Sequence, residues 1–380
     1  MKLKTKLAGS LFVICVSLII ILSTQNYKYP DAEEINKRLN YLQRVIHQPL
    51  ESDSDIMALG KESAEFMLFS YSYSVYALTN LAVRDTMYTK LATDLIKESI
   101  IKVLDNKITS TYGIDSTILT ADSLPEYSIL YLGHLNLMIG CYRLICSDSS
   151  FNFLNDNISK SLFQRYNETE YLNLESYPES IWIPDNTVAI ASLKLHSSNT
   201  NSNYGSICTK WSQYAKAHYI DNETGVLFST VDPNTGEPIE EPRGSMLGWS
   251  IMFIYQFDSD FAIDLYKNYK TNFSKNYVVL RPFRERYNSK ETGMGDVDSG
   301  PLFLGYSIPA NEFALGNSIL AGDKKTARQI LRLIGIGAKK VRNNNEIRYK
   351  VRFVKMNISP MAEALVLNSL TVTKWTRTLE

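Results

Sequence analysis

The sequence has little of several residue types that define common classes of protein. Its 380 residues include only four histidines and four cysteines. Cys15 lies in the N-terminal leader, and the other three cysteines cannot all pair within one chain. Because the histidines and cysteines show no metal-binding spacing, we expect buried free thiols and no bound metal.

Net charge and the common catalytic signatures are also missing. Forty Lys and Arg residues balance forty Asp and Glu residues, so the chain lacks the basic excess that is typical of nucleic-acid-binding proteins. We find no G-x-S-x-G nucleophile motif, no H-E-x-x-H zinc motif, no phosphate-binding loop and no dinucleotide fingerprint. The sequence therefore predicts no nucleic-acid partner and no cofactor.

What the chain does have is apolar and aromatic sequence in ordinary globular proportions. Hydrophobic residues make up 44 % of it and charged residues 21 %, and there are 24 tyrosines. This composition can bury a large core. Length alone allows one large domain or two to three smaller ones. We expect residues 28–380 to form a single domain.

The N-terminus resembles a targeting segment. Lys2, Lys4 and Lys6 precede an apolar run from Leu7 to Leu22. A secretory signal and a signal anchor both begin in this way, but no small-x-small cleavage site follows the run. We therefore expect residues 1–27 to be an uncleaved transmembrane signal anchor, with the remaining chain on the periplasmic or extracellular side.

The rest of the chain has mostly helical periodicity. We expect about twelve helices, of which the second is capped by Asp53 or Ser54 and runs through Val83. We also expect a β-hairpin within 224–242 and a strand at 346–354. Most links are short, so consecutive helices should form antiparallel hairpins. Six such hairpins predict an all-α (α/α)6 toroid. An open helical solenoid is the alternative, but no sequence repeat supports it.

Polar and aromatic residues gather at alternate helices of this series. The clusters lie before or within the fourth, sixth, eighth and tenth predicted helices; they include Tyr131, His134, Tyr177, Trp182, Asp185, Asn186, Arg243, Trp249, Asp296 and Asp298. If outer and inner helices alternate, the N-termini of these even-numbered helices open at one end of the toroid. That end would form a polar, aromatic-lined cup, which is the usual form of a ligand site.

The segment from Asp296 to Tyr306 carries the strongest of these signals. Asp296 and Asp298 lie directly before an apolar, Gly- and Pro-containing stretch that leads into a helix from about Pro309 to Ala321. One interpretation is that Asp298 or Ser299 caps that helix. The other is that the two carboxylates line a cavity, because a buried carboxylate is unfavourable unless it is paired or used.

Each of the other candidates also has two interpretations. His134 is either a packed helical histidine or a proton-transfer group. The pair Asp185 and Asn186 either starts a helix or faces a substrate. Arg243 is either a surface residue or a substrate contact. The indoles of Trp182 and Trp249 are either core residues or stacking surfaces for a sugar or an apolar substrate.

Four short motifs resemble the linalool dehydratase/isomerase-like domain. They are Trp182–Asn186, Pro242–Ser245, Asp298–Pro301 and, upstream, Tyr131–His134. The resemblance covers about residues 120–325 and implies an (α/α)6 barrel related in shape to six-hairpin glycosidases. It would make His134 the match of the family's active-site histidine. Tyr71 or Tyr73 would be the candidates to match the tyrosine that the family carries on its second helix.

One departure from that family concerns its thiols. The family's linalool enzyme uses two cysteines that flank the segment matched by Trp182–Asn186. Here Trp182 and Ala191 stand near those places. The resemblance therefore implies the fold more strongly than it implies linalool as the substrate.

These observations favour a membrane-anchored, extracytoplasmic enzyme with one cup-shaped site and acid–base chemistry, of lyase or isomerase type. We expect Asp298, Asp185 and His134 to transfer protons. The expected substrate-binding residues are Asn186, Arg243, Tyr131, Trp182, Trp249, Asp296 and Tyr73. The alternatives are a glycan-processing enzyme similar to glycoside hydrolases, and a non-catalytic glycan- or lipid-binding envelope protein. The expected partners are a small-molecule or glycan substrate and, through the N-terminal helix, a membrane.

Overall fold

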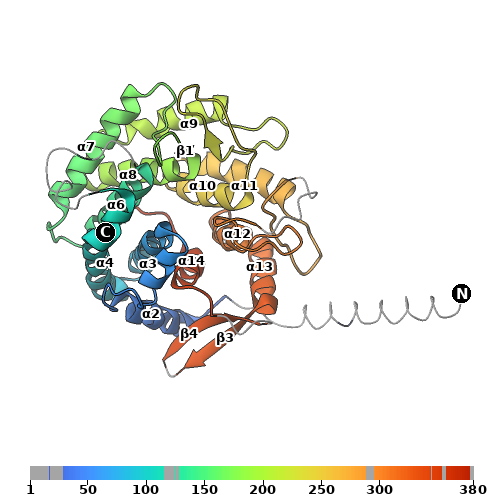
Figure 1. Ribbon diagram of the computed structural model, residues 1–380. Helices are drawn as coiled ribbons and strands as arrows, with labels where there is room; N and C mark the ends of the chain where they lie inside the picture. The colour runs from blue at the N-terminus through green and yellow to red at the C-terminus, as the bar shows by residue number, and fades with distance from the viewer. Residues whose placement is uncertain are drawn as a thin grey trace, which may run out of the picture.

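The long helices form an inner ring surrounded by an outer ring in the computed structural model (Figure 1). The structure describes residues 29–114, 128–287, 295–343, 345–352 and 357–376, with the isolated residues 17 and 124. The inner ring contains α3 (Ala64–Arg84), α6 (Ile129–Ile145), α8 (Ile183–Thr200), α10 (Gly244–Phe257), α12 (Ile308–Leu320) and α14 (Pro360–Thr371). The outer ring contains α2 (Ala32–Ile46), α4 (Thr89–Val103), α7 (Asn152–Glu168), α9 (Ser206–His218), α11 (Ser259–Phe273) and α13 (Lys324–Gly337).

The two rings differ in how their helices are patterned. The inner helix α6 buries 15 of its 17 residues, so it is covered by protein on all sides. The outer helix α2 buries six of its 15 residues along one stripe, and the other nine are partly or fully exposed. Inner and outer helices alternate along the chain, so the even-numbered helices of the sequence prediction are the inner ones. The prediction of about twelve helices in six hairpins is therefore confirmed.

The inner ring is closed by contact between its first and last helices. The side-chain amide of Asn80 in α3 donates a 2.9 Å hydrogen bond to Oδ1 of Asn368 in α14. Trp375, just after α14, donates its indole N–H to Oδ1 of Asn80 at 2.8 Å. Because α3 and α14 pack along their length, the open-solenoid alternative is excluded.

The short elements lie in the loops that join the helices. They are α5 (Asn106–Thr109), the 3-10 turns at Met57–Lys61, Thr86–Tyr88 and Ser110–Tyr112, and the strands β1 (Ile181–Trp182), β2 (Thr230–Val231), β3 (Ala338–Asn343) and β4 (Glu346–Val351). Strand β1 pairs with β2 in an antiparallel manner, which joins the loop before α8 to the loop before α10. Strands β3 and β4 form an antiparallel ribbon.

Three local predictions need correction. The predicted hairpin within 224–242 does contain a turn closed by a hydrogen bond from the backbone N–H of Asp232 to the carbonyl of Glu237, but β2 pairs mainly with β1. The ribbon partner β3 was not predicted. The second helix begins at Ala64 instead of near Asp53, because the polar stretch before it folds into a 3-10 turn.

The predicted membrane anchor lies outside this description. Residues 1–27 fall outside the described residues, apart from Ser17. In the described ranges, no helix is both long enough and apolar enough to cross a membrane. The anchor therefore stays a prediction from the sequence.

Candidate active site

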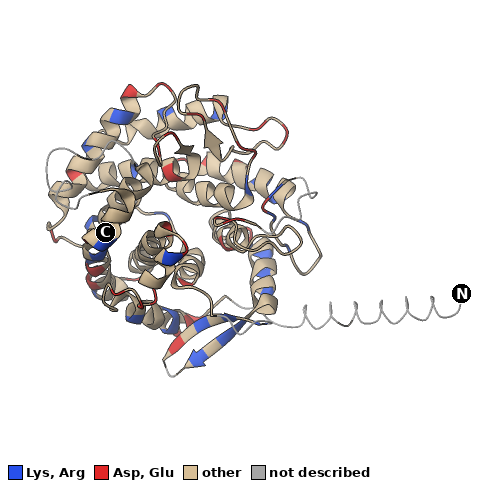
Figure 2. Cartoon of the chain, in the orientation of Figure 1, with Lys and Arg blue, Asp and Glu red and all other residues tan. Residues whose placement is uncertain are grey.

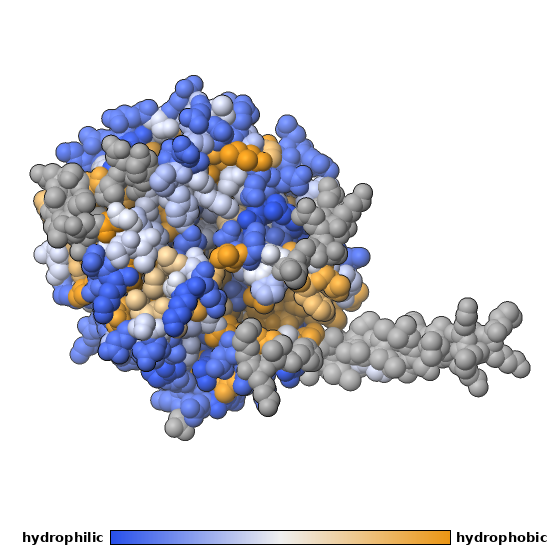
Figure 3. All heavy atoms as spheres, viewed as in Figure 1, coloured by the Kyte–Doolittle hydropathy of each residue, from blue (hydrophilic) through white to orange (hydrophobic). Residues whose placement is uncertain are grey.

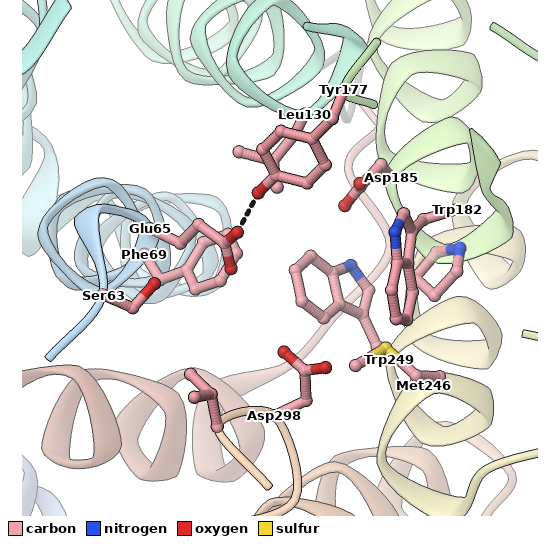
Figure 4. A pocket seen from close by; sticks show the side chains of 12 residues that line it. Ser63, Glu65, Phe69, Leu130, Tyr177, Trp182, Asp185, Met246, Trp249 and Asp298 are labelled. Carbon is pink, nitrogen blue, oxygen red and sulfur yellow. Dashed lines mark hydrogen bonds between the residues drawn. The ribbon is translucent and has the colours of Figure 1, made fainter. Parts of the chain in front are cut away.

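A cavity of about 190 Å³ opens at the end of the barrel where the inner helices begin (Figure 4). Residues from the starts of α3, α6, α8 and α10 line it, together with the loops before α8 and α12. The lining residues are Ser63, Glu65, Phe69, Leu130, Tyr177, Trp182, Pro184, Asp185, Met246, Trp249, Val297 and Asp298. The cup predicted at the N-termini of alternate helices therefore exists, and four predicted site residues line it.

Three carboxyl groups point into this cavity from separate elements (Figure 4). Glu65 comes from the first turn of α3, Asp185 from the first turn of α8, and Asp298 from the loop that precedes α12. Asp298 does not cap α12, because Oγ of Ser307 accepts the hydrogen bond from the backbone N–H of Ala310. The interpretation of Asp298 as a helix cap is therefore wrong.

Glu65 is the carboxyl group that the sequence analysis missed. The hydroxyl of Tyr177 donates a hydrogen bond to Oε1 of Glu65 across the cavity (Figure 4). Burial raises the pKa of Glu65 to about 7, and the nearby negative charge of Asp298 acts in the same direction. Glu65 therefore exchanges its proton near neutral pH, which suits a general acid or base.

The other two carboxyl groups also have raised pKa values. Burial raises the pKa of Asp185 well above its usual range, and the charges of Glu65 and Asp298 add to that effect. Burial likewise raises the pKa of Asp298, although the Arg243 guanidinium opposes the shift. Three carboxyl groups in one cavity cannot all be ionised at low cost, so the site retains protons at neutral pH.

Aromatic rings form the remaining walls. The rings of Phe69 and Trp249 meet edge to face with centroids 4.9 Å apart, and the indole of Trp249 stacks on Phe313 at 5.9 Å. Trp182, at the end of β1, stands beside Trp249 on the same side of the cavity (Figure 4). The cavity therefore offers flat apolar surfaces directly beside the carboxyl groups.

Arg243 lies behind this wall and binds three carboxylates. Its Nη2 donates to both oxygens of Asp296 at 2.7 and 2.8 Å, its Nη1 lies 3.3 Å from Oδ2 of Asp298, and its Nε lies 2.9 Å from Oε1 of Glu285. Glu285 is buried and also accepts hydrogen bonds from Ser245. Arg243 thus holds the loop that carries Asp298, and the half-exposed Asp296 is part of that attachment.

His134 and Tyr73 lie beneath the cavity floor. The imidazole of His134 packs against Phe69 and Trp249, with ring centroids 5.3 and 5.7 Å away. Its Nδ1 lies 2.8 Å from the Tyr76 hydroxyl, and burial lowers its pKa to about 3. His134 is therefore neutral and does not reach the cavity surface.

Three polar atoms under this floor have no hydrogen-bond partner among the described residues. They are Nε2 of His134, the hydroxyl of Tyr73 and Nε1 of Trp249. The three rings contact one another, with centroids about 6 Å apart. Buried polar groups are normally paired, so this cluster is an unusual feature of the barrel axis.

Asn186 and Tyr131 are placed away from the cavity. Both ends of the Asn186 amide bond to the backbone of Leu174, and its Oδ1 also accepts from the Tyr166 hydroxyl. The hydroxyl of Tyr131 donates to the carbonyl of Val103 at 3.0 Å. In this geometry both residues support the fold around the site, and the predicted substrate contacts have no support from it.

No cysteine is among the residues that line the cavity. Cys141 and Cys208 are buried, Cys146 is half-buried, and all three are free thiols. A search of the described residues finds no cluster of three His, Cys, Asp or Glu side chains suited to a metal ion. The polar groups in reach of a bound molecule are thus three carboxyls, the phenol of Tyr177, the hydroxyl of Ser63 and the indoles.

A known protein family matches most of the region that builds this site. The family is described as linalool dehydratase/isomerase, and its sequence model matches residues 146–350. The match includes Trp182, Asp185, Arg243, Trp249 and Asp298. It does not include Glu65, Tyr73 or His134, which lie earlier in the chain.

Two solved structures with a similar architecture are a mannanase and a glucuronyl hydrolase. The α-1,6-mannanase GH76A from Salegentibacter sp. HEL1_6 matches with a TM-score of 0.57 at 11 % identity, over 90 % of this chain and 98 % of that one. The unsaturated glucuronyl hydrolase from Bacillus sp. GL1 matches with a TM-score of 0.54 at 10 % identity, over 92 % and 98 %. At such low identity these similarities show the six-hairpin fold alone.

Proposed function

The chain belongs to the linalool dehydratase/isomerase family, and from this premise we propose that it is an acid–base lyase or isomerase acting on a small uncharged alcohol. The observation that carries the proposal is the convergence of Glu65, Asp185 and Asp298 on one aromatic-walled cavity. Burial raises the pKa of all three carboxyl groups, and Glu65, with a pKa of about 7, can donate and accept a proton near neutral pH.

The surroundings of the three carboxyl groups suit two of them to donate a proton and one to accept a proton. Of the three, Asp298 alone has a direct ion pair among the described residues, with Arg243, and this contact favours its ionised form. Glu65 and Asp185 have no such ion pair and retain their protons more readily. We assign proton donation to Glu65 or Asp185 and proton acceptance to Asp298.

The reaction steps follow from that division. A carboxylic acid protonates the hydroxyl of the alcohol, the C–O bond breaks, and water leaves with the bonding electrons. The resulting cation is stabilised by the faces of Trp182 and Trp249. Asp298 removes a proton from the adjacent carbon, and the C–H electrons form the double bond. If water instead adds to another carbon of the same cation, the added oxygen loses a proton to the carboxylate that donated the first one, and the product is an isomeric alcohol.

The size and charge of the cavity limit the substrate. At about 190 Å³ it is smaller than the roughly 300–1,000 Å³ that drug-sized ligands occupy, so it suits a molecule of one ring or a short branched chain. No Lys or Arg side chain lines it, and Arg243 is already shared by carboxylates. An anionic substrate such as a uronic acid is therefore disfavoured.

The second candidate is hydrolysis of a neutral glycoside. Two indoles beside paired carboxyl groups suit a stacked sugar ring, with one carboxyl as the acid and another as the base or nucleophile. The mannanase and glucuronyl hydrolase structures support this candidate by fold only.

The deciding experiment compares two substrate panels on the full chain. One panel contains unsaturated alcohols of five to ten carbons, with product alkenes and isomers measured by gas chromatography. The other contains neutral aryl hexosides. We expect alcohol turnover, reduced by about 10²- to 10⁴-fold in Glu65→Gln and Asp298→Asn. The control is Glu62→Gln, an exposed position one turn earlier.

Other outcomes would point elsewhere. Hexoside cleavage without alcohol turnover would replace the lyase assignment by a glycosidase. Binding without turnover on either panel, unchanged in Asp298→Asn, would support the non-catalytic binding protein.

The compartment is a proposal from the sequence. The lysines before Leu7 would keep the N-terminus in the cytoplasm, and the body would then lie outside it. A fusion of alkaline phosphatase after residue 376 should be active in cells. An inactive fusion with normal expression would contradict this orientation.

A further inference from the structure

Exposed apolar side chains are concentrated in one segment of the surface. Eleven large hydrophobic residues are exposed among the described residues, and six of them lie between Tyr277 and Ile308. Phe303 is 77 % exposed, Val278 72 % and Leu304 69 %. Apolar surface is visible beside α13 in the space-filling view (Figure 3). Such a concentration indicates a contact surface, because isolated exposed hydrophobic residues would be scattered.

Two of these residues occupy the tips of adjacent turns with left-handed backbone. Val278 has φ 66° and Leu304 has φ 53°. The turns are closed by hydrogen bonds between Tyr277 and Leu280 and between Phe303 and Tyr306. The hydroxyls of Tyr277 and Tyr306 lie 3.0 Å apart and join the turns. Gly or Asn would adopt this conformation with less strain, so the apolar tips are kept at some loss of folding stability.

The surface next to these turns is strongly basic. Nε2 of Gln329 in α13 donates to the carbonyl of Val278 at 2.7 Å, so the first turn rests on α13. Residues 324–352, which form α13 and the β3–β4 ribbon, contain ten Lys and Arg residues and one Glu, in a chain with no net charge. Lys and Arg positions recur along α13 and the ribbon (Figure 2). Lys339 and Arg342 are exposed and have no ion pair in the described ranges.

The first described residues of the barrel also lie beside α13 and the ribbon. Pro30 lies beside Leu331, Gly335 and Lys340 of α13 and the ribbon, and Lys340 pairs with Glu34 of α2. Seven residue steps separate Tyr29 from Leu22, the end of the apolar run, so they span at most about 25 Å. A membrane that held this run would therefore lie close to α13 and the ribbon.

We propose that the two apolar turns, α13 and the β3–β4 ribbon together form a docking face that rests on an anionic lipid bilayer. The tips at Val278, Phe303 and Leu304 would enter the interfacial region, while the lysines and arginines would bind headgroup phosphates. The two tyrosines between them suit the same depth. The neighbouring residue Val297 lines the cavity, so docking brings the cavity mouth near the lipid.

This inference does not require the proposed acid–base activity. It concerns a surface outside the three carboxyl groups, and its readout is contact with lipid. Turnover of a water-soluble alcohol could be present or absent without changing the result. Failure of one proposal is thus distinguishable from failure of the other.

The test uses the full chain in nanodiscs made with brominated lipids, which quench nearby indoles. Leu304→Trp adds an indole at a turn tip. Phe153→Trp is the matched control, because Phe153 is 65 % exposed and lies on α7, across the ring from α13 (Figure 1). We expect the Leu304→Trp signal to fall about twofold in nanodiscs rich in phosphatidylglycerol, and the Phe153→Trp signal to stay within a tenth of its starting value.

The charge contribution is tested in the Leu304→Trp background. Lys339→Glu with Arg342→Glu should remove most of the quenching, whereas Lys160→Glu with Lys210→Glu, on α7 and α9, should leave it unchanged. Equal quenching of the Leu304 and Phe153 probes, or none in either, overturns the proposal. Quenching that is the same in neutral lipid and insensitive to the ribbon charges overturns it as well.

Discussion

Nη1 of Arg243 lies 3.3 Å from Oδ2 of Asp298, at the wall of the cavity. The same guanidinium is held from behind by buried Glu285, whose Oε1 lies 2.9 Å from Nε. Glu285 therefore fixes the position of the Arg243 guanidinium, and Arg243 in turn fixes the position of Asp298 in its loop. Arg243 positions the proton acceptor of the proposed reaction, although it does not line the cavity itself.

Replacing Arg243 should change the pH dependence of the reaction as well as its rate. Arg243→Lys keeps a positive charge but loses the planar fork that binds several carboxylates at once. Without that contact the pKa of Asp298 should rise further, so the acidic limb of the kcat/KM profile should move to higher pH. We expect kcat/KM at pH 7 to fall about 10- to 100-fold.

Two further variants separate positioning from folding. Arg243→Gln leaves Glu285 buried without its partner and should lower the free energy of unfolding by about 3–5 kcal/mol. Glu240→Gln alters a carboxylate 4.0 Å from Arg243 and 37 % exposed, and should have little effect. An unshifted pH profile in Arg243→Lys would show that Arg243 has no influence on the titrating group.

Glu65 should make the protein less stable as the pH rises. Its pKa is about 7 in the fold, above the ordinary value of 4.5, so the folded state holds the proton more tightly than the unfolded state. Below pH 4.5 Glu65 is protonated in both the folded and the unfolded state, so it adds no pH dependence to the free energy of unfolding there. Between pH 4.5 and 7 the unfolded state ionises first, and stability falls by a total on the order of 3 kcal/mol.

Urea unfolding at pH 5 and pH 8 measures this effect. Glu65→Gln retains an acceptor for Tyr177 and cannot ionise, so its loss of stability over this interval should be smaller than that of the wild type. The exposed control Glu62→Gln should behave as the wild type does. Identical pH dependence in all three proteins would mean that Glu65 is not held in its neutral form.

Gly244 should tolerate no side chain, because the backbone beside it is too close. A Cβ at this position would lie 1.9 Å from the carbonyl oxygen of Arg284. Its N–H also donates to the carbonyl of Glu285 at 2.8 Å, next to the Arg243 ion pair. Gly244→Ala should lower the free energy of unfolding by about 3 kcal/mol and reduce activity with it.

Gly337 provides the matched control for this prediction. It also lies at the end of a helix, but a Cβ added there would have no neighbouring atom within 4 Å, so Gly337→Ala should be nearly neutral. Thermal unfolding of both variants measures the difference. Equal melting temperatures would show that the backbone at Arg284 moves away at no cost.

His134 should remain neutral throughout the physiological range. Burial lowers its pKa to about 3, below the ordinary 6.5, so as the pH falls from 6.5 the unfolded state gains a proton first. Stability is then lost between pH 6.5 and 3. The His134 ring signals in an NMR spectrum, assigned by their loss in His134→Gln, should not move between pH 5 and 8. A titration in that range would place the ring in contact with water.

The architecture could be predicted because it depends on local patterns. Helical periodicity and short links can both be recognised from neighbouring residues in the sequence. Together they predict hairpins of alternating outer and inner helices. The N-termini of the inner helices then converge, which is why the polar clusters at Trp182, Asp185 and Asp298 indicated the end of the barrel where the cavity opens.

The missing parts of the site depend on long-range geometry. Glu65 belongs to the same pattern, but the expected helix start near Asp53 hid its position in the first turn. The buried partner of Arg243 is Glu285, 42 residues away, and no local motif connects them. Asn186 is occupied by the backbone of Leu174, and His134 lies under Phe69. Such contacts depend on how the loops fold and how the aromatic side chains pack, and local sequence patterns do not show either.

Closure of the inner ring by α3 and α14 has a consequence for the order of events during synthesis. Asn80 meets Asn368, 288 residues later, so α3 lacks one of its two inner neighbours until α14 has left the ribosome. The face of α3 that packs on α14 stays uncovered while the helices between them are synthesised, and contacts of such long range form slowly. The inner ring therefore closes only after α14 has been synthesised, and the docking of α14 against α3 is the step that completes it.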